Sequence, residues 1–127
     1  MINVIFNGAS GRMGSALVPL LQKSELINLV AQTARCDDLG AAIQQHNPDC
    51  VIDFTIPSCV FENAKIIIEN SARPIIGTSG LNDAQITSLR QMCADKQLGG
   101  LIVANFSISA ILMQEFSNIA AKWFHDV

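Results

Sequence analysis

The chain has no tyrosine, few basic residues and no long apolar run. A short-chain dehydrogenase uses a Tyr-x-x-x-Lys pair as its acid, so the lack of tyrosine excludes that class of enzyme. The eight lysines and arginines are scattered singly and the net charge is −3, which leaves no basic stripe for nucleic acid or an anionic membrane. No apolar run reaches the roughly 18 residues needed to span a bilayer, and the first residues do not resemble a signal peptide. We therefore expect a cytoplasmic protein without nucleic-acid or membrane partners.

The cysteines also lack the spacing of a functional site. Cys36, Cys50, Cys59 and Cys93 form no Cys-x-x-Cys pair and have no histidine at metal-ligand spacing. We interpret them as reduced structural thiols and predict no metal site. An enzyme of the semialdehyde dehydrogenase type would need a cysteine activated by a histidine or a helix terminus. The sequence places no histidine near Cys59 or Cys93, so it disfavours this class of enzyme.

Apolar runs typical of strands alternate with helical patterns along the whole chain. The expected strands are residues 2–7, 28–34, 50–54, 74–76 and 101–104, and the expected helices are 15–22, 39–45, 58–70, 82–96 and 108–124. Asn82 and Gln85 have the spacing of a capping box. Short apolar strands separated by helices predict an α/β fold, a doubly wound parallel sheet buried on both faces. Residues 1–127 are expected to form one Rossmann-like dinucleotide-binding domain.

A glycine-rich turn joins the first strand to the first helix. Its sequence is Gly8-Ala9-Ser10-Gly11-Arg12-Met13-Gly14. Glycines let the backbone approach a pyrophosphate closely, and a helix N-terminus offers unpaired N–H groups with a partial positive charge. The turn therefore predicts a phosphorylated ligand such as a dinucleotide. Its Gly-x-x-Gly-x-x-Gly spacing is one residue longer than the Rossmann fingerprint, so glycines kept only for close packing remain the alternative.

The end of the second expected strand bears on cofactor choice. Ligands of a doubly wound sheet bind across the carboxyl ends of its strands. A site that prefers NAD would carry an acidic residue there, but the chain has Ala34 followed by Arg35. An arginine suits the 2′-phosphate of NADP through charge-assisted bonds, although Asp37 and Asp38 lie close and a solvated arginine is the alternative.

Three further strand ends carry groups that could meet a ligand. They are Phe54-Thr55-Ile56-Pro57, Gly77-Thr78-Ser79-Gly80 and Asn105-Phe106-Ser107. The first offers an aromatic face and a hydroxyl, the second hydroxyls and exposed backbone, and the third a carboxamide and a ring that could flank a nicotinamide. A core phenylalanine, a helix-starting proline and a plain turn are the structural alternatives. Four such segments at one sheet edge favour a ligand site more strongly than any one of them.

Taken together, these segments resemble a known family. Gly8 to Gly14, Asp53-Phe54-Thr55 with Pro57, Ile76 to Gly80 and Val103 to Ser107 are similar, in order and spacing, to the cofactor-binding domain of dihydrodipicolinate reductases. The resemblance covers nearly the whole chain. Ser79 stands where the family usually has a second threonine, and Ala34 stands where many members carry an acidic residue.

The resemblance implies reduction of 4-hydroxytetrahydrodipicolinate to tetrahydrodipicolinate in lysine (diaminopimelate) biosynthesis, with NADPH or NADH as the hydride donor. Arg35, next to a position that lacks an acidic residue, predicts that NADPH is preferred over NADH. It implies that the cofactor pyrophosphate and ribose lie against Gly8, Ala9, Ser10, Gly11, Arg12 and Met13. Arg35 would meet the adenosine ribose or its phosphate. The cofactor would be lined by Phe54, Thr55, Gly77, Thr78 and Ser79, with Ser79 also near the substrate, and the nicotinamide enclosed by Val103, Ala104, Asn105 and Phe106.

The family's second domain has no counterpart in these residues. It brings a His-His pair, a lysine and a Ser-Gly-Thr segment for the substrate, and no segment here matches them. We interpret His125 as a solvated terminal residue and His46 as a loop residue, and we expect no catalytic residue in this chain. We expect it to be the cofactor-binding half of a reductase of a small cyclic dicarboxylate, inactive alone, from a family whose full-length members are homo-oligomers. The alternative is a freestanding NAD(P)-binding or sensing module.

Overall fold

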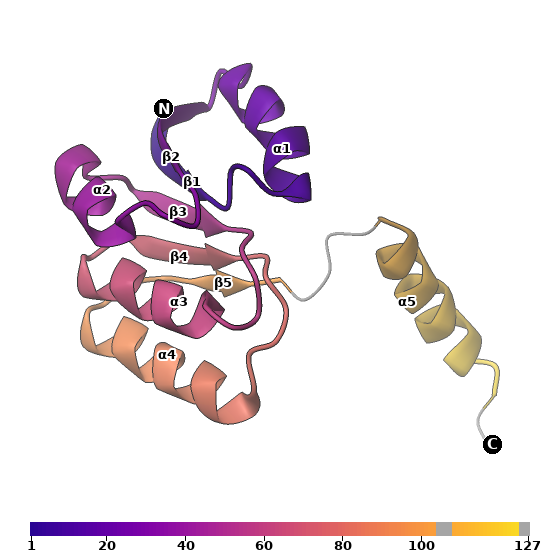
Figure 1. Cartoon of the computed structure of the whole chain (residues 1–127). Helices are drawn as coiled ribbons and strands as arrows, with labels where there is room; N and C mark the ends of the chain where they lie inside the picture. The colour runs from indigo at the N-terminus through magenta and orange to yellow at the C-terminus, as the bar shows by residue number, and fades with distance from the viewer. Residues whose placement is uncertain (104–107, 125–127) are drawn as a thin grey trace.

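A computed structural model describes residues 1–103 and 108–124 of the chain (Figure 1). Strands alternate with helices throughout. The strands are β1 (Ile2–Asn7), β2 (Ile27–Thr33), β3 (Cys50–Asp53), β4 (Arg73–Ile76) and β5 (Leu101–Ile102); the helices are α1 (Arg12–Gln22), α2 (Leu39–His46), α3 (Val60–Glu69), α4 (Asp83–Asp95) and α5 (Ile108–Ala121). All strand pairs are parallel, in the order β2-β1-β3-β4-β5. The predicted α/β, Rossmann-like fold is confirmed.

The main apolar core lies between the sheet and three helices. Ile5, Val51 and Ile76, from three neighbouring strands, pack in one cluster with Ile67 of α3 and Leu89 of α4. The helix α1 instead contacts β1 and β2. Right-handed crossovers that leave β1 in one direction and β3 in the other place their helices on opposite faces of the sheet. The sheet is therefore doubly wound, and the direction of winding reverses between β1 and β3.

An irregularity in the pairing of β1 with β2 sets the register at the ends of these strands. Val4 lies opposite Leu29 and Ile5 lies opposite Ala31, so Val30 is an extra residue in β2. Because of this extra residue, Asn7 lies opposite Thr33 and not Gln32. On its other side Asn7 lies opposite Asp53 of β3. Three polar residues therefore meet at one level of the sheet.

Three expectations are corrected by the structure. His46 is not a loop residue but the last residue of α2, where it is half-buried. The first helix begins at Arg12 and not at residue 15, because Gly11 is an extended N-cap whose carbonyl accepts hydrogen bonds from the Ser15 N–H (2.9 Å) and hydroxyl (3.0 Å).

The expectation that every strand is buried on both faces is wrong for the two edge strands: in β2 only Thr33 is buried, and β5 is more exposed still. Its residues Leu101 and Ile102 are 54% and 40% exposed, since β5 is a two-residue edge strand with a single neighbour.

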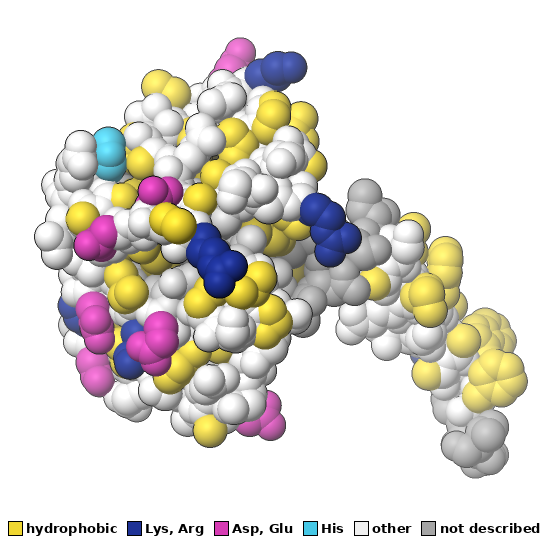
Figure 2. All heavy atoms as spheres, in the orientation of Figure 1, with side chains coloured by type: hydrophobic (Ala, Val, Ile, Leu, Met, Phe, Trp, Pro, Cys, Tyr) yellow, Lys and Arg dark blue, Asp and Glu magenta, His cyan; other side chains and the backbone are white. Residues whose placement is uncertain are grey.

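The helix α5 lies apart from the sheet and the other helices (Figure 1). Hydrophobic side chains cover much of its visible surface in Figure 2, and the exposed hydrophobic residues of α5 include Leu112, Met113 and Phe116. On the same face of the molecule, lysines and arginines stand singly. No helix in the described ranges combines the length and the apolar character needed to cross a membrane.

The predicted capping box is present at the start of α4. The Asn82 side chain accepts from the Gln85 N–H at 2.9 Å, and the Gln85 side chain accepts from the Asn82 N–H at 3.0 Å. We expect Asn82→Ala to lower the free energy of unfolding by about 1 kcal/mol, because the Gln85 N–H in the first turn of α4 loses its acceptor. Urea denaturation measures the loss. Asn82→Asp keeps the acceptor oxygen and serves as the control; an equal loss in both variants would show that the cap is not the cause.

Candidate functional site

The loops that follow β1, β2 and β3 enclose a cavity of about 450 Å³. It lies at the carboxyl ends of these strands, at the reversal between β1 and β3, which is where open α/β sheets bind their ligands. The cavity is lined by Asn7, Gly8, Ser10, Gly11, Ala34, Arg35, Asp37, Leu39, Phe54, Thr55, Ile56, Ser58, Cys59 and Asn63. Six of the predicted cofactor contacts are among them: Gly8, Ser10, Gly11, Arg35, Phe54 and Thr55. A larger hollow of about 610 Å³, between α4 and β5, is mostly apolar and contains none of the predicted residues.

The three glycines of the turn serve different purposes. Gly8 has φ +92°, and a Cβ there would lie 2.3 Å from the Phe54 carbonyl oxygen; a Cβ on Gly14 would lie 2.3 Å from that of Ala9. Both positions exclude a side chain through the protein's own packing. Gly11 has an ordinary extended backbone (φ −79°), and among the described residues other than its chain neighbours the atom nearest its Cβ position is the Gly8 carbonyl oxygen, at 3.2 Å. Gly11 thus keeps one wall of the cavity free of a side chain at a position where packing excludes a Cβ less strictly than it does at Gly8 and Gly14.

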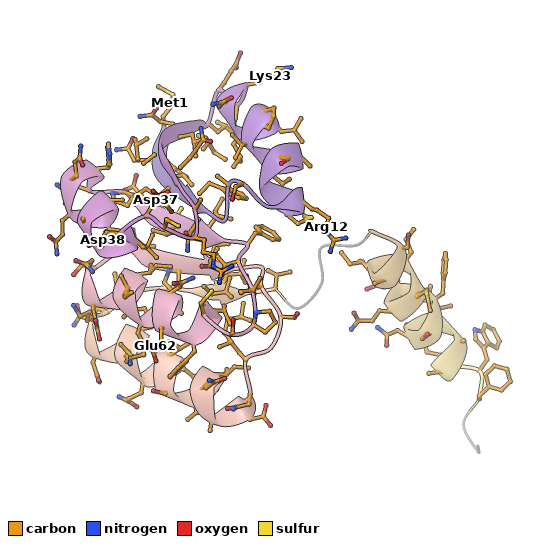
Figure 3. The ribbon with its side chains drawn as sticks, in the orientation of Figure 1. Met1, Arg12, Lys23, Asp37, Asp38 and Glu62 are labelled. Carbon is orange, nitrogen blue, oxygen red and sulfur yellow. The ribbon has the colours of Figure 1, made fainter. Side chains whose placement is uncertain are left out.

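The N-terminus of α1 is open toward this wall. Asp38 caps α2 and Asn82 caps α4 by accepting backbone N–H groups, whereas Gly11 has no side chain to cap α1, and the first turn contains no acidic residue. The first N–H groups of a helix carry a partial positive charge that favours an anion. Arg12 begins the helix and extends outward from it (Figure 3). This arrangement can receive a phosphate group.

The loop after β2 holds one exposed cation and two acidic residues with local partners. The Asp37 carboxylate accepts from the Ala34 N–H at 2.8 Å, and the Asp38 carboxylate accepts from the Ala41 N–H at 2.9 Å. Figure 3 shows both acidic residues beside α2. Arg35 is exposed at the cavity and has no acidic group within ion-pair distance in the described ranges.

The ends of β3 and β4 are joined through Phe54. Its ring stacks on Phe6 with centroids 5.8 Å apart, and a Cβ on Gly77 would lie 2.5 Å from it. Thr78 is only 7% exposed, and its hydroxyl points to Asp53, whereas Ser79 is exposed.

The other predicted residues lie elsewhere. Ala9, Arg12 and Met13 lie in the glycine turn and in the start of α1, outside the cavity lining, and Val103 follows β5. Ala104, Asn105 and Phe106 lie outside the described residues.

Sequence reasoning assigned no role to the polar residues beneath the cavity. Asn7, Thr33 and Asp53 are buried at the last positions of β1, β2 and β3, and Asn63 reaches the cavity from α3. The sequence did contain a signal for them, because each of these three strands ends in a polar residue. A buried polar group is retained only when it is hydrogen-bonded, so polar residues at neighbouring strand ends indicate a hydrogen-bonded cluster.

The cysteines take no part in an activated pair. All four are free, and burial raises the pKa of the Cys50 and Cys93 thiols, the nearby Asp49 adding to the effect at Cys50. Cys59 lines the cavity, where its thiol donates to the Ile56 carbonyl (3.5 Å) and accepts from Asn63 (3.7 Å). A raised pKa leaves less thiolate at neutral pH, so Cys50 and Cys93 are poorly suited to act as nucleophiles.

The fold and the cavity define a class of protein, a Rossmann-like domain of the kind found in dinucleotide-binding oxidoreductases. Within that class the chain belongs to the dihydrodipicolinate reductase family. Residues 2–106 match the family described as "Dihydrodipicolinate reductase, N-terminus". Family and fold together indicate a domain that binds a nicotinamide dinucleotide.

Individual relatives agree with this assignment. The 4-hydroxy-tetrahydrodipicolinate reductase of Coxiella burnetii (strain Dugway 5J108-111) is 46% identical over 99% of this chain and 53% of its own length. The enzyme of the same name from Legionella pneumophila (strain Paris) is 44% identical over 98% of this chain and 51% of its own. The chain therefore spans about half the length of the curated relatives it matches.

Solved structures show the same fold. A dipicolinate-bound dihydrodipicolinate reductase from Paenisporosarcina sp. TG-14 superposes with a TM-score of 0.84, at 29% identity, over 95% of this chain and 54% of that one. A biliverdin reductase from Synechocystis sp. PCC 6803, in complex with biliverdin and NADP+, has a TM-score of 0.67 at 13% identity over 80% of this chain and 37% of its own. The second likeness shows the fold alone.

The contact between Gly77 and the Phe54 ring can be tested directly. We expect Gly77→Ala to lower the free energy of unfolding by about 1–3 kcal/mol, because the new methyl group would overlap the ring and force it to move. Chemical denaturation gives the value. Gly99→Ala is the matched control, since no atom of the described residues, its chain neighbours aside, lies within 4 Å of its Cβ position, and it should be neutral or slightly stabilising. Equal stability of the two variants would contradict the packing argument.

Proposed function

We propose that the chain binds NADPH, and NADH less tightly, across the carboxyl ends of its strands and supplies the cofactor-binding half of a reductase. The observation that carries this proposal is the wall formed by Gly11 and the uncapped start of α1, where a pyrophosphate can approach the backbone. The bound cofactor supplies the hydride that converts 4-hydroxytetrahydrodipicolinate to tetrahydrodipicolinate in lysine biosynthesis. The names of the relatives support this reaction.

We assign each part of the cofactor to a strand end. Residues 8–13 hold the pyrophosphate and the adjacent ribose, and Arg35 meets the adenosine ribose or its 2′-phosphate. Phe54, Thr55 and residues 77–79 line the cofactor, with Ser79 on the substrate side. Residues 103–106 enclose the nicotinamide. A cyclic dicarboxylate substrate is supported by the solved relative that has dipicolinate bound.

The preference for NADPH rests on the loop after β2. Arg35 is exposed at the cavity and free of acidic partners among the described residues, so its guanidinium can meet a 2′-phosphate. Both neighbouring carboxylates accept backbone N–H groups of their own loop and helix. Asp37 also lines the cavity, so its carboxylate is the group that would reduce this preference.

We further propose that turnover depends on groups other than the cofactor-site residues, which hold the substrate and protonate the product. Hydride transfer needs the acceptor held within about 3–3.5 Å of the donor, together with a group that protonates the product. Among residues 1–103 and 108–124 we assign only Ser79 to the substrate side and none to proton transfer. The chain by itself should therefore bind the reduced cofactor without reducing the substrate.

Gly11→Val tests the proposed pyrophosphate site. The branched side chain would occupy the wall that the pyrophosphate approaches, so we expect NADPH binding to be lost while the thermal unfolding transition is retained. The fluorescence of the reduced nicotinamide reports binding. Gly99→Val, at the amino-terminal edge of the sheet, is the control and should bind NADPH like the unmodified chain. NADPH affinity that survives Gly11→Val would overturn the site.

Arg35→Ala tests the choice of cofactor. The variant should lose about tenfold in NADPH affinity, the value of one charge-assisted hydrogen bond reduced by solvent exposure, with little change for NADH. Titrations of both cofactors at low and high salt measure the effect. In the unmodified chain the difference between the NADPH and NADH affinities should become smaller as the salt concentration rises. Lys23→Ala removes an exposed cation at the far end of α1 and is the control. Unchanged NADPH affinity in Arg35→Ala would show that Arg35 is only a solvated surface residue.

A further inference from the structure

The side chain of Asp53 is fully buried and surrounded by hydrogen-bond donors. Its Oδ1 accepts from the Thr55 hydroxyl (2.7 Å), the Thr78 hydroxyl (2.8 Å) and the Thr55 N–H (3.2 Å). Its Oδ2 accepts from the side-chain amides of Asn7 (2.8 Å) and Asn63 (2.9 Å). Every one of these donors is a neutral group. A buried carboxylate held only by neutral donors depends on all of them, because each lost bond leaves charge uncompensated away from water.

The hydrogen bonds continue beyond Asp53 on both sides. The Asn7 side-chain oxygen accepts from the Thr33 hydroxyl at 2.9 Å, which extends the network to the end of β2. The Thr78 hydroxyl accepts from the Thr55 N–H at 2.8 Å, which ties the loop after β4 to the loop after β3. No buried side-chain nitrogen or oxygen in the described ranges lacks a partner. The network therefore joins the ends of four strands, β2, β1, β3 and β4.

Most members of the network lie close in sequence to residues that we assign to the cofactor, and Thr55 and Thr78 are themselves among those residues. Asn7 precedes Gly8, Thr33 lies two positions before Arg35, and Thr78 precedes Ser79. The hydroxyl of Thr55 is held by Asp53 and by Asn63, which donates to it at 3.2 Å. The protein thus uses the Thr55 and Thr78 hydroxyls to fix the backbone beneath the cavity.

We propose that Asp53 is a positioning residue for the cofactor site, which sets the loops after β1, β3 and β4 directly and the loop after β2 through Asn7. This inference rests on the proposed function, because it assigns a purpose to those loops. Asp53 itself does not touch the cofactor, since its side chain is completely covered. Loss of its carboxylate should move several loops at once, and binding should weaken without the removal of any contact to NADPH.

Asp53→Asn is the first test, because it keeps the size of the side chain and replaces one acceptor oxygen by a donor. We expect the Kd for NADPH to rise about tenfold, because only about a tenth of the variant molecules would hold these loops in the binding-competent arrangement. In the chain without NADPH, amide hydrogen exchange of residues 8–11, 54–58 and 77–80 should become faster together. Exchange is the deciding readout, because a residue that only contacted the cofactor would not alter it in the free chain.

A second pair of variants keeps the proposal falsifiable if Asp53→Asn does not fold. Thr78→Val removes the hydroxyl that bridges Asp53 and the Thr55 N–H, and Thr78→Ser restores it. Thr78→Val should show faster exchange at residues 54–58 in the free chain and weaker NADPH binding, and Thr78→Ser should recover both. Ile67→Val, in the apolar core of α3, lowers stability without touching the network and should leave the Kd unchanged.

The outcomes separate this inference from the proposed function. If the unmodified chain binds no NADPH, the proposed function fails, and loop exchange in the variants still decides whether Asp53 positions the loops. The inference is overturned if a folded Asp53→Asn or Thr78→Val variant shows unchanged loop exchange. It is also overturned if Ile67→Val weakens binding as much as they do, because the effect would then be one of general stability.

Discussion

The carboxylate of Asp53 is the point at which the sheet and the loops above it are joined. A buried carboxylate is tolerated only where donors surround it, and those of Asp53 come from β1, from α3 and from the loops after β3 and β4. Satisfying this one group therefore constrains four segments at once. Apolar packing is non-directional, so it does not set the orientation of several loops at once as these hydrogen bonds do.

The molecule divides stability and ligand chemistry between two regions. Apolar side chains of α2, α3 and α4 cover one face of the sheet, where Ile5, Val51 and Ile76 are almost completely buried. Polar residues collect at the carboxyl ends of the strands. The glycine turn belongs to both regions, because Gly8 and Gly14 are required by close backbone contacts, whereas Gly11 leaves space at the cavity. The same short motif thus serves packing and an open binding surface.

The loop after β2 shows how local hydrogen bonds can shape specificity. Two acidic residues follow Arg35, and from sequence alone they could have neutralised it or repelled a phosphate. In the structure Asp38 caps α2 and Asp37 accepts from the Ala34 N–H. Both carboxylates are engaged with backbone donors, while Arg35 faces solvent at the cavity. The net effect of the loop on an anion therefore depends on where its side chains point as much as on its composition.

The sequence by itself determined the order of the strands and helices, the capping box of Asn82 and Gln85, and the glycine turn, because each depends on residues a few positions apart. Only the tertiary structure decided which strand ends meet. The extra residue Val30 places Thr33 opposite Asn7, and Asn7 reaches Asp53, 46 positions away. The tertiary structure also decided that β5 is an exposed edge strand. Register and burial depend on pairing between distant segments, which local periodicity does not encode.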